Sequence, residues 1–280
     1  MHDINITLVN YQAKDDLLEA VASVMNDVVA SPYSARVTVV DNSNNRDGLK
    51  ESLAESHPAV VYADPAENIG FGRGTTFGFQ QAPARYYFAL NPDTRLLPGS
   101  KTIRKLIEFM DAHPRVGCIG PKLVYMDDTP QASCYRFQVS AIAAKPFKHI
   151  DLDKRYRRVR KYTDRLLMTD FDRNRTRPVD WVLGAAMVVR KEVTDAIGWF
   201  DPRYFMYMED CDWCRTMWER GWPVYYVHDI VIQHRYARDS AKVPGVVPAL
   251  WQNPLARAHL KSWLQYMWKW RGKNKYFATR

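Results

Sequence analysis

Three carboxylates lie within four residues in the segment Glu209-Asp210-Cys211-Asp212. Acidic residues at the start of a helix interact favourably with the helix dipole, which is a purely structural explanation for their presence. The apolar stretch Met206-Tyr207-Met208 comes directly before them, so we expect the acids to emerge at the edge of an apolar cleft. Two adjacent carboxylates in a cleft can hold one of the pair poised as a general base. Glu209 and Asp210 are therefore the candidate catalytic residues.

A further carboxylate, Asp93, follows a predicted apolar strand in the segment Asn91-Pro92-Asp93-Thr94. An acid at such a position is costly unless it has a partner. A hard cation such as Mg²⁺ or Mn²⁺ binds one or two carboxylates together with phosphate oxygens of a substrate. Such an ion also neutralises the charge that develops on a leaving pyrophosphate. Asp93 is the candidate metal ligand, and a simple turn is the alternative, because Pro-Asp-Thr is a good turn sequence.

Polar and glycine-rich residues also follow three other predicted strands. They are Asn10-Tyr11, Asp41-Asn42-Ser43 and Asn68-Ile69-Gly70-Phe71-Gly72-Arg73-Gly74. The ring of Tyr11 can stack on a base, and the Asp41 carboxylate can accept a hydrogen bond from a pyrimidine imide or a ribose hydroxyl. The three glycines let a backbone approach a ligand closely. Their spacing after a third strand is not the dinucleotide-binding fingerprint, and a tight turn before a helix is the alternative.

Strand and helix patterns alternate over the first 120 residues, and these elements must position the polar residues. The expected strands are 4–11, 36–41, 59–63 and 85–90, and the expected helices are 14–29, 48–57, a stretch through Phe79, and 100–113. This order predicts an α/β fold with a mostly parallel sheet and right-handed crossovers. Ligands of such sheets bind at the carboxyl ends of the strands. Four polar strand ends at one edge therefore indicate a pocket.

The remainder of the chain is less regular. Periodicity is lost over 127–178, where Lys145–Arg177 is rich in basic residues; a solvated excursion and an anion- or membrane-facing insert both fit. A strand and a short helix are expected over 179–193, a strand pair over 223–234, and a final helix over 254–271. The simplest partition is one domain, residues 1–250, followed by a tail, residues 251–280.

The 280 residues carry a formal charge of +9. A basic balance favours an anionic partner, such as nucleic acid, acidic lipid or a phosphorylated small molecule, without choosing among them. The pair Cys211-x-x-Cys214 lacks a second CxxC for a zinc site, so we expect reduced, structural cysteines. The N-terminal segment lacks the pattern of a signal peptide, and no apolar run approaches the roughly 18 residues of a membrane span. We therefore expect a protein of the cytosol or of the cytosolic face of a membrane.

Taken in order, these residues resemble family 2 inverting glycosyltransferases, and in particular bacterial rhamnosyltransferases of polysaccharide assembly. The resemblance covers residues 4–240 and is carried by an ordered set of motifs. The set is Asn10-Tyr11, Asp41-Asn42-Ser43, Asn68-x-Gly70-Phe71-Gly72-x-Gly74, Asn91-Pro92-Asp93, Gly184 and Glu209-Asp210-x-Asp212. The resemblance implies a GT-A fold, a Rossmann-like and mostly parallel sheet flanked by helices, here with an amphipathic C-terminal helical tail.

The resemblance also implies a role for each matching residue. The implied nucleotide- and donor-binding residues are Asn10, Tyr11, Asp41, Asn42, Asn68, Gly70, Gly72, Gly74, Asn91 and Asp93. Asp210 corresponds to the catalytic base, with Glu209 beside it orienting the acceptor, whose cleft Trp181 and Gly184 would line. Asp93 corresponds to the last carboxylate of the family's DxD motif for Mg²⁺ or Mn²⁺, whose first carboxylate is replaced here by Asn91. His234 aligns with a His-x-x-x-x-x-Ser segment as a metal or pyrophosphate ligand, and a structural histidine is the alternative.

The implied reaction moves a sugar from a nucleotide diphosphate donor to a saccharide acceptor. The family branch favours dTDP-rhamnose, with a UDP-sugar second, and an acceptor linked to a polyprenyl diphosphate. Asp210 would take a proton from the acceptor hydroxyl, whose oxygen attacks the anomeric carbon opposite the nucleotide and inverts it. A sugar nucleotidylyltransferase, the first rival, would carry a Gly-rich basic loop where residues 10–13 read Asn-Tyr-Gln-Ala. A nucleic-acid-binding protein, the second, would not need the acids of 209–212.

The predicted helix over 254–271 carries Leu, Met and Trp at helical spacing with Arg and Lys among them. Trp combined with basic residues suits a bilayer interface. Packing against the domain, or a dimer, is the alternative. We expect peripheral association with an anionic membrane surface on the cytoplasmic face of the inner membrane, and no nucleic-acid partner.

Overall fold

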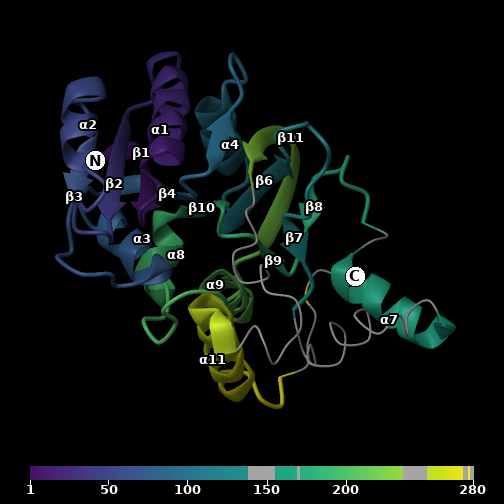
Figure 1. The fold of residues 1–280 in the computed structure, drawn as a ribbon. Helices are drawn as coiled ribbons and strands as arrows, with labels where there is room; N and C mark the ends of the chain where they lie inside the picture. The colour runs from purple at the N-terminus through teal and green to yellow at the C-terminus, as the bar shows by residue number, and fades with distance from the viewer. Residues whose placement is uncertain (138–154, 169–170, 236–250, 274–276, 278–280) are drawn as a thin grey trace.

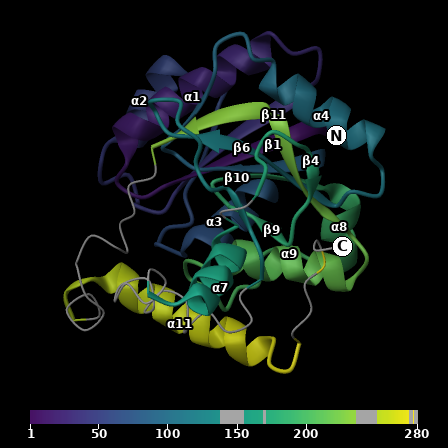
Figure 2. The same ribbon diagram turned by 90° about the vertical axis from the view of Figure 1, so that its right-hand side faces the viewer.

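The computed structural model describes residues 1–137, 155–168, 171–235, 251–273 and 277 (Figure 1). Its centre is a nine-stranded sheet in the order β3-β2-β1-β4-β10-β6-β11-β5, with β8 paired to β11. Figure 2 shows α1, α2 and α4 over one face of this sheet, and α3, α8 and α9 over the other. The helix α11 lies outside α9 as a further layer. The expected helix-flanked α/β sheet is therefore confirmed.

The amino-terminal half contains the parallel part of the sheet. Its strands are β1 (His2–Asn10), β2 (Ala35–Asp41), β3 (Val61–Ala63) and β4 (Ala84–Leu90), and its helices are α1 (Lys14–Val29), α2 (Leu49–Ser56) and α3 (Phe71–Phe79). The strand β1 pairs in parallel with both β2 and β4. Their carboxyl ends, Asn10, Asp41 and Leu90, consequently lie along one edge. This half follows the predicted alternation, with boundaries within one or two residues.

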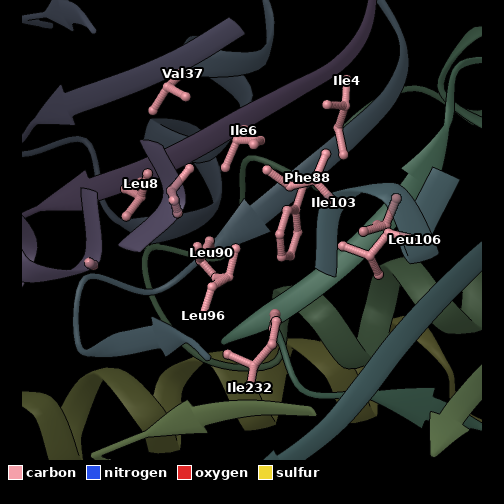
Figure 3. Close-up of a cluster of buried hydrophobic side chains, with 14 of the residues drawn as sticks. Ile4, Ile6, Leu8, Val37, Phe88, Leu90, Leu96, Ile103, Leu106 and Ile232 are labelled. Carbon is pink, nitrogen blue, oxygen red and sulfur yellow. The ribbon is translucent and has the colours of Figure 1, made fainter. Parts of the chain in front are cut away.

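The core has two layers because alternate residues of each central strand face opposite sides of the sheet. Phe88 and Leu90 of β4 pack under α1 and α4, in the cluster that Figure 3 shows. Tyr87 and Ala89 of the same strand face the layer made by α3, α8, α9 and α11. All of these strand residues are buried. A strand buried on both faces requires the continuous apolar run that 85–90 shows in the sequence.

The carboxyl-terminal half adds mixed pairing. It contains β5 (Thr94–Leu96), α4 (Thr102–Ala112), β6 (Cys118–Val124), β7 (Cys134–Tyr135), α7 (Arg157–Leu167), β8 (Arg177–Pro178), β9 (Trp181–Val182), β10 (Ala186–Arg190), α8 (Lys191–Ile197), α9 (Glu209–Glu219), β11 (Val224–His234) and α11 (Pro254–Lys269). The strand β10 runs antiparallel to both β4 and β6. The small pair β7 and β9 forms a separate two-stranded sheet. Among the described residues of 127–178, the helix α7 and the short strands β7 and β8 were not predicted.

The strand pair expected over 223–234 is wrong. The segment is one strand, β11, which pairs with β6 along its length and shifts register between Val227 and Val231. The polar dipeptide His228-Asp229 in the middle of the segment indicates a turn, but it forms a bulge instead. Thr176 stabilises this bulge. The Thr176 hydroxyl lies 2.9 Å from Nδ1 of His228 and accepts a hydrogen bond from the His228 backbone N–H at 3.2 Å.

The predicted tail helix exists, and one of its faces packs against the domain. Ser262, Tyr266 and Trp270 of α11 are buried, and Tyr266 and Trp270 join the core layer that contains α9. The proposed boundary between residues 250 and 251 adjoins the segment 236–250, which lies outside the described residues. The partition into a domain and a tail therefore stays a prediction. Within the described residues, no helix is both long enough and apolar enough to cross a membrane.

A carboxylate of α1 caps the start of α4. Asp27 is buried, and its two oxygens accept from the backbone N–H groups of Thr102 at 2.9 Å and Ile103 at 2.8 Å. The first N–H groups of a helix have no partner within the helix. The residue that precedes α4, Lys101, cannot accept these bonds. Asp27 therefore fixes α4 to α1 above the sheet.

We expect Asp27→Ala to lower the free energy of unfolding by about 1–3 kcal/mol, because two buried N–H groups lose their acceptor. Urea denaturation measures this change. Glu108→Ala, on the exposed side of α4 where Glu108 pairs with Arg104, is the matched control and should cost less than about 0.5 kcal/mol. Equal losses for both variants would contradict the capping role.

Candidate active site

Two backbone N–H groups connect the carboxyl end of β4 with the start of α9. Asn91 donates its N–H to the carbonyl of Ala185 at 2.9 Å. Gly184, the preceding residue, donates its N–H to Oδ2 of Asp210 at 2.8 Å. The turn that carries Asp93 and the helix that carries Asp210 therefore meet across two adjacent residues. The structure brings together the two acids that the sequence singled out from distant positions.

Asp210 is a buried carboxylate held by backbone N–H groups. Its Oδ2 accepts from Gly184, and its Oδ1 accepts from the N–H of Cys211 at 2.7 Å. Burial raises the pKa of Asp210 to about 6, against the opposing effect of these N–H groups. The side chain is ionised at neutral pH and takes up a proton under mildly acidic conditions. Such a group is suited to general-base catalysis near neutral pH.

Glu209 is buried beside Asp210 but has a different protonation state. Its Oε2 atom has no hydrogen-bond partner within the described part of the chain. Burial, together with the negative charge of Asp210, raises the pKa of Glu209 well above its ordinary value. Two neighbouring buried carboxyls do not both ionise readily. Glu209 therefore holds a proton more readily than an exposed glutamate does, and the protonated carboxyl can donate a hydrogen bond.

Asp212, the third acid of the segment, faces the C-terminal helix instead. Its Oδ2 accepts from Nζ of Lys269 at 2.7 Å. Its Oδ1 accepts from Nε1 of Trp270 at 2.7 Å and from the hydroxyl of Tyr204 at 3.0 Å. Burial still raises its pKa, although Lys269 opposes this. The three acids thus do not form a single cluster, and Asp212 connects α9 to α11.

The loop before α9 has an uncommon backbone. Tyr207 and Met208 both have φ of 69°, in the left-handed region that non-glycine residues rarely adopt. The helix α11 supports this loop: Ser262 donates its hydroxyl to the carbonyl of Met206 at 2.8 Å, and the rings of Tyr207 and His259 lie 4.6 Å apart. The position of Glu209 and Asp210 therefore depends on contacts from the end of the chain.

The glycines of the loop 68–74 allow close packing in this structure, and their predicted donor-binding role stays a prediction. A Cβ on Gly70, whose φ is +85°, would lie 2.1 Å from the carbonyl oxygen of Phe205. A Cβ on Gly72 would meet the side chain of Glu209 at 3.3 Å, and one on Gly74 would meet Asn42 at 3.2 Å. The glycines let α3 approach α9 and the end of β2 closely.

The side chains of Asn10, Asp41 and Asn42 are all buried, and their predicted ligand contacts stay predictions. Oδ1 of Asp41 accepts from Asn10 and from the backbone and hydroxyl of Ser43, and Oδ2 accepts from Asn45 and Tyr62. Burial alone would raise the pKa of Asp41, but these bonds outweigh it and lower the pKa. Asn42 donates to the carbonyl of Gly70 at 3.0 Å. These residues hold the strand ends together.

Asp93 and His234 form the candidate metal site. Oδ1 of Asp93 lies 3.2 Å from Nε2 of His234. The other ring nitrogen, Nδ1, lies 2.7 Å from Oε1 of Gln131, whose amide nitrogen donates to the His234 carbonyl. This orientation places the proton of a neutral ring on Nδ1. Nε2 then presents a lone pair toward the carboxylate, an arrangement that a cation between the two atoms would stabilise.

This donor set fits Mg²⁺ or Mn²⁺ with few protein ligands. The described residues contain no group of three or more His, Cys, Asp or Glu side chains able to hold a metal. One carboxylate and one imidazole leave positions for phosphate oxygens, as such ions prefer when they bind with a substrate. Asn91, where the motif could carry a second carboxylate, bonds through its backbone to Ala185.

The remaining predicted residues occupy different environments. Tyr11 is 51% exposed at the end of β1 and is available for stacking. Asn68 accepts from the N–H of Gly70 at 3.0 Å and forms part of a turn. Trp181 is buried and stacks on Tyr135, with ring centroids 4.7 Å apart, and its predicted acceptor contact stays a prediction. The serine of the His-x-x-x-x-x-Ser segment lies outside the described residues.

Sequence reasoning missed Gln131, Lys269 and Trp270. Gln131 lies in the stretch without periodicity, and no local signal identifies it. For the other two a signal existed: Asp210 and Asp212 are two residues apart on a helix, so they point to different sides. The second acid consequently needed a cationic partner on another element.

The mixed, mostly parallel sheet flanked by helices, with acidic residues along its carboxyl edge, has the GT-A fold of glycosyltransferases. Residues 2–244 match the family model described as glycosyltransferase like family 2. The chain belongs to this family.

Relatives agree with this assignment. An N-acetylglucosaminyl-diphospho-decaprenol L-rhamnosyltransferase of Mycobacterium tuberculosis is 26% identical over 234 residues, which cover 78% of this chain and 72% of that protein. Two solved structures share the fold. GalNAc-T7 with UDP, GalNAc and Mn²⁺ has a TM-score of 0.62 at 13% identity, covering 84% of this chain. A mannosyltransferase of Pyrobaculum calidifontis with GDP-Man and Mn²⁺ has a TM-score of 0.58 at 14% identity, covering 95%. The chain spans 44% and 66% of the lengths of these two chains.

We expect Glu209→Gln to stabilise the protein at about pH 8, with a gain that shrinks toward about pH 5. In the wild type, Glu209 keeps its proton when folded and loses it when unfolded above its ordinary pKa of 4.5. The stability that it contributes is therefore complete below that value and decreases as the pH rises, by at most about 1.4 kcal/mol per pH unit. Gln has no proton to lose. Unfolding free energies of both proteins across this range measure the difference.

The control for this effect is Glu192→Gln on the exposed surface of α8. Its difference from the wild type should not change with pH. A pH-independent difference for Glu209→Gln as well would contradict the protonated state of Glu209.

Proposed function

We propose that this glycosyltransferase inverts the anomeric carbon of a sugar that it moves from a nucleotide diphosphate to a saccharide hydroxyl. The observation that carries this proposal is the anchored carboxylate of Asp210. This carboxylate is ionised near neutral pH and accepts a hydrogen bond from the Gly184 N–H. The next residue, Ala185, accepts a hydrogen bond from Asn91 in the turn that carries Asp93. A single displacement requires a base at the acceptor and charge stabilisation at the leaving group, and these two acids supply one function each.

Asp210 removes the proton of the acceptor hydroxyl as its oxygen attacks the anomeric carbon. The proton moves to the carboxylate, the new bond forms on the face opposite the nucleotide, and the bond to the diphosphate breaks. Glu209 donates a hydrogen bond to a substrate hydroxyl from its protonated carboxyl. A Cβ at Gly184 would lie 3.3 Å from Cβ and 3.4 Å from Oδ2 of Asp210, so a larger side chain there would crowd the carboxylate.

Asp93 and His234 would hold Mg²⁺ or Mn²⁺, which supplies positive charge for the leaving diphosphate when it is bound. Arg235 follows His234, is half exposed, and pairs with Asp16 at 2.5 Å. Its guanidinium adds charge at the same edge of the sheet. Gln131 keeps the proton of the His234 ring on Nδ1, and Tyr11 offers a ring on which the nucleotide base can stack.

The proposed donor is dTDP-L-rhamnose, and a UDP-sugar is the second candidate. The first follows from the M. tuberculosis relative, which is an L-rhamnosyltransferase; the second follows from GalNAc-T7, which was solved with UDP. The proposed acceptor is a saccharide linked to a polyprenyl diphosphate, because the same relative is named for such a substrate.

We expect Asp210→Asn to lower turnover by about 10²- to 10⁴-fold, because the amide cannot accept the proton. The assay measures nucleoside diphosphate released from a panel of sugar nucleotides with a saccharide acceptor. In the wild type, kcat/KM should fall about tenfold per pH unit below about pH 6, since protonation of Asp210 removes the base. NMR of the product should show the anomeric configuration inverted.

Asp229→Asn, an acid whose side chain is 65% exposed on β11, is the matched control and should keep full turnover. Thermal unfolding and donor binding separate loss of the base from loss of the fold. Turnover that survives in Asp210→Asn would contradict the base assignment, and a retained anomeric configuration would contradict the single displacement.

We expect Asp93→Asn and His234→Gln to weaken Mn²⁺ binding by at least about tenfold when nucleoside diphosphate is present. Electron paramagnetic resonance of free Mn²⁺ measures this binding without any turnover. Asp127→Asn, in an exposed turn, should bind Mn²⁺ as the wild type does. Unchanged binding in both site variants would show that these residues do not hold the metal.

A further inference from the structure

The outward face of α11 combines apolar and basic side chains. Leu260, Leu264 and Trp268 are 41%, 53% and 69% exposed. They are four residues apart, so they form one stripe along the helix. Arg257 and Lys261 are exposed on the same side of the helix, one turn apart. This face therefore offers a row of large apolar groups flanked by positive charge.

The stripe is exposed even though α11 is packed against the domain. The opposite face of α11 is fixed to α9 by Lys269 and Trp270, and Arg215 of α9 donates to the hydroxyl of Tyr266 at 3.0 Å. The helix is thus held in one orientation, with its apolar stripe turned to the outside. Leu and Trp side chains gathered at a fixed exposed face favour a partner that removes them from water.

The charge around the stripe indicates what this partner is. Residues 251–273 contain five Lys and Arg residues and no acidic residue. The guanidinium of Arg271 lies 4.2 Å from the centre of the Trp268 ring. Trp beside Arg or Lys is the combination found at the headgroup level of bilayers. Anionic lipids add about 1 kcal/mol for each basic side chain near the surface.

A second basic element lies on the same side of the molecule. Figures 1 and 2 both place α7 and α11 away from α1, α2 and α4. The exposed basic residues of this element are Arg157, Arg158, Arg160 and Lys161 on α7, and Arg155 just before it. Positive charge on this side of the molecule is therefore not confined to α11.

We propose that the outward face of α11 lies on an anionic phospholipid bilayer. Leu260, Leu264 and Trp268 enter the interface, and the basic side chains of α11 and α7 contact the headgroups. Nucleic acid would satisfy the charges but leave the apolar stripe in water. A second copy of the chain would cover the stripe but bring two basic faces together across a symmetric contact.

Docking of α11 on the bilayer also fixes the distance between the bilayer and α9, the helix that carries Asp210. Ser262 and His259 of α11 contact the loop 206–208, and Lys269 contacts Asp212. In Figure 2, α11 begins on the side where β11 ends, which is the edge of the sheet that carries His234. Resting on the proposed function, this arrangement presents Asp210 to an acceptor anchored in the same bilayer.

The test measures co-sedimentation of the full chain with phosphatidylcholine vesicles and with vesicles containing roughly one third phosphatidylglycerol. We expect binding to the anionic vesicles only, weakened by salt. The double variant Leu264→Glu/Trp268→Glu should lose at least about tenfold in affinity, and Lys261→Glu should lose less but measurably. Val29→Glu, an apolar position that is 83% exposed on α1, is the matched control and should bind as the wild type does.

Binding by the double variant equal to that of the wild type, or no binding of the wild type to anionic vesicles, would overturn the proposal. A wild-type dimer that becomes a monomer in the double variant, with no vesicle binding, would also overturn it in favour of a contact between copies. Nucleoside diphosphate release with a soluble acceptor should be unchanged in the double variant. If the wild type itself released no nucleoside diphosphate, this result would count against the proposed function, independently of vesicle binding.

Discussion

The burial of three carboxylates in the first turn of α9 is the constraint on which the rest of this structure depends. An ionised group that leaves water must recover its lost solvation within the protein. The helix meets this requirement in three ways: Asp210 accepts backbone N–H groups, Asp212 receives a cation from α11, and Glu209 keeps its proton. Because the solutions differ, adjacent acids acquire different chemistry. Under the proposed function, Asp210 is the base near neutral pH and Glu209 a hydrogen-bond donor, while Asp212 holds α9 to α11.

The carboxyl edge of the sheet, which lies beside this helix, is held together by hydrogen bonds and close packing. Polar residues at this edge, such as Asn10 and Asp41, form hydrogen bonds with one another and with nearby loops. The glycines of the loop before α3 let helices and strand ends pack closely. Asp210 is held in place by the backbone N–H groups of Gly184 and Cys211, and Asp93 lies 3.2 Å from His234. Such preorganisation is what electrostatic stabilisation of a transition state requires.

The amino-terminal half could be predicted from the sequence because its signals are local. The helix over 14–29 and the strand over 85–90 follow from periodicity alone, and the rule for parallel sheets places their polar ends together. The partners of the site residues could not be predicted in the same way. Gln131 reaches His234, and Lys269 reaches Asp212, through the tertiary fold. Likewise, the polarity of Asp41 indicates hydrogen bonding but does not tell whether the partner is a ligand or the protein itself.

The contact between Lys269 and Asp212 joins residues 57 positions apart, with the cation on the later one. Synthesis on the ribosome proceeds toward the carboxyl terminus, so Asp212 emerges while its partner has not yet been made. The strands β1 to β4 can pair by then, but the third acid of α9 still lacks the cation that neutralises it in the complete chain. The ion pair that joins α9 to the C-terminal helix can therefore form only after residue 269 has been made. A nascent chain that stops before this point lacks both the ammonium group of Lys269 and the indole N–H of Trp270 as partners for Asp212.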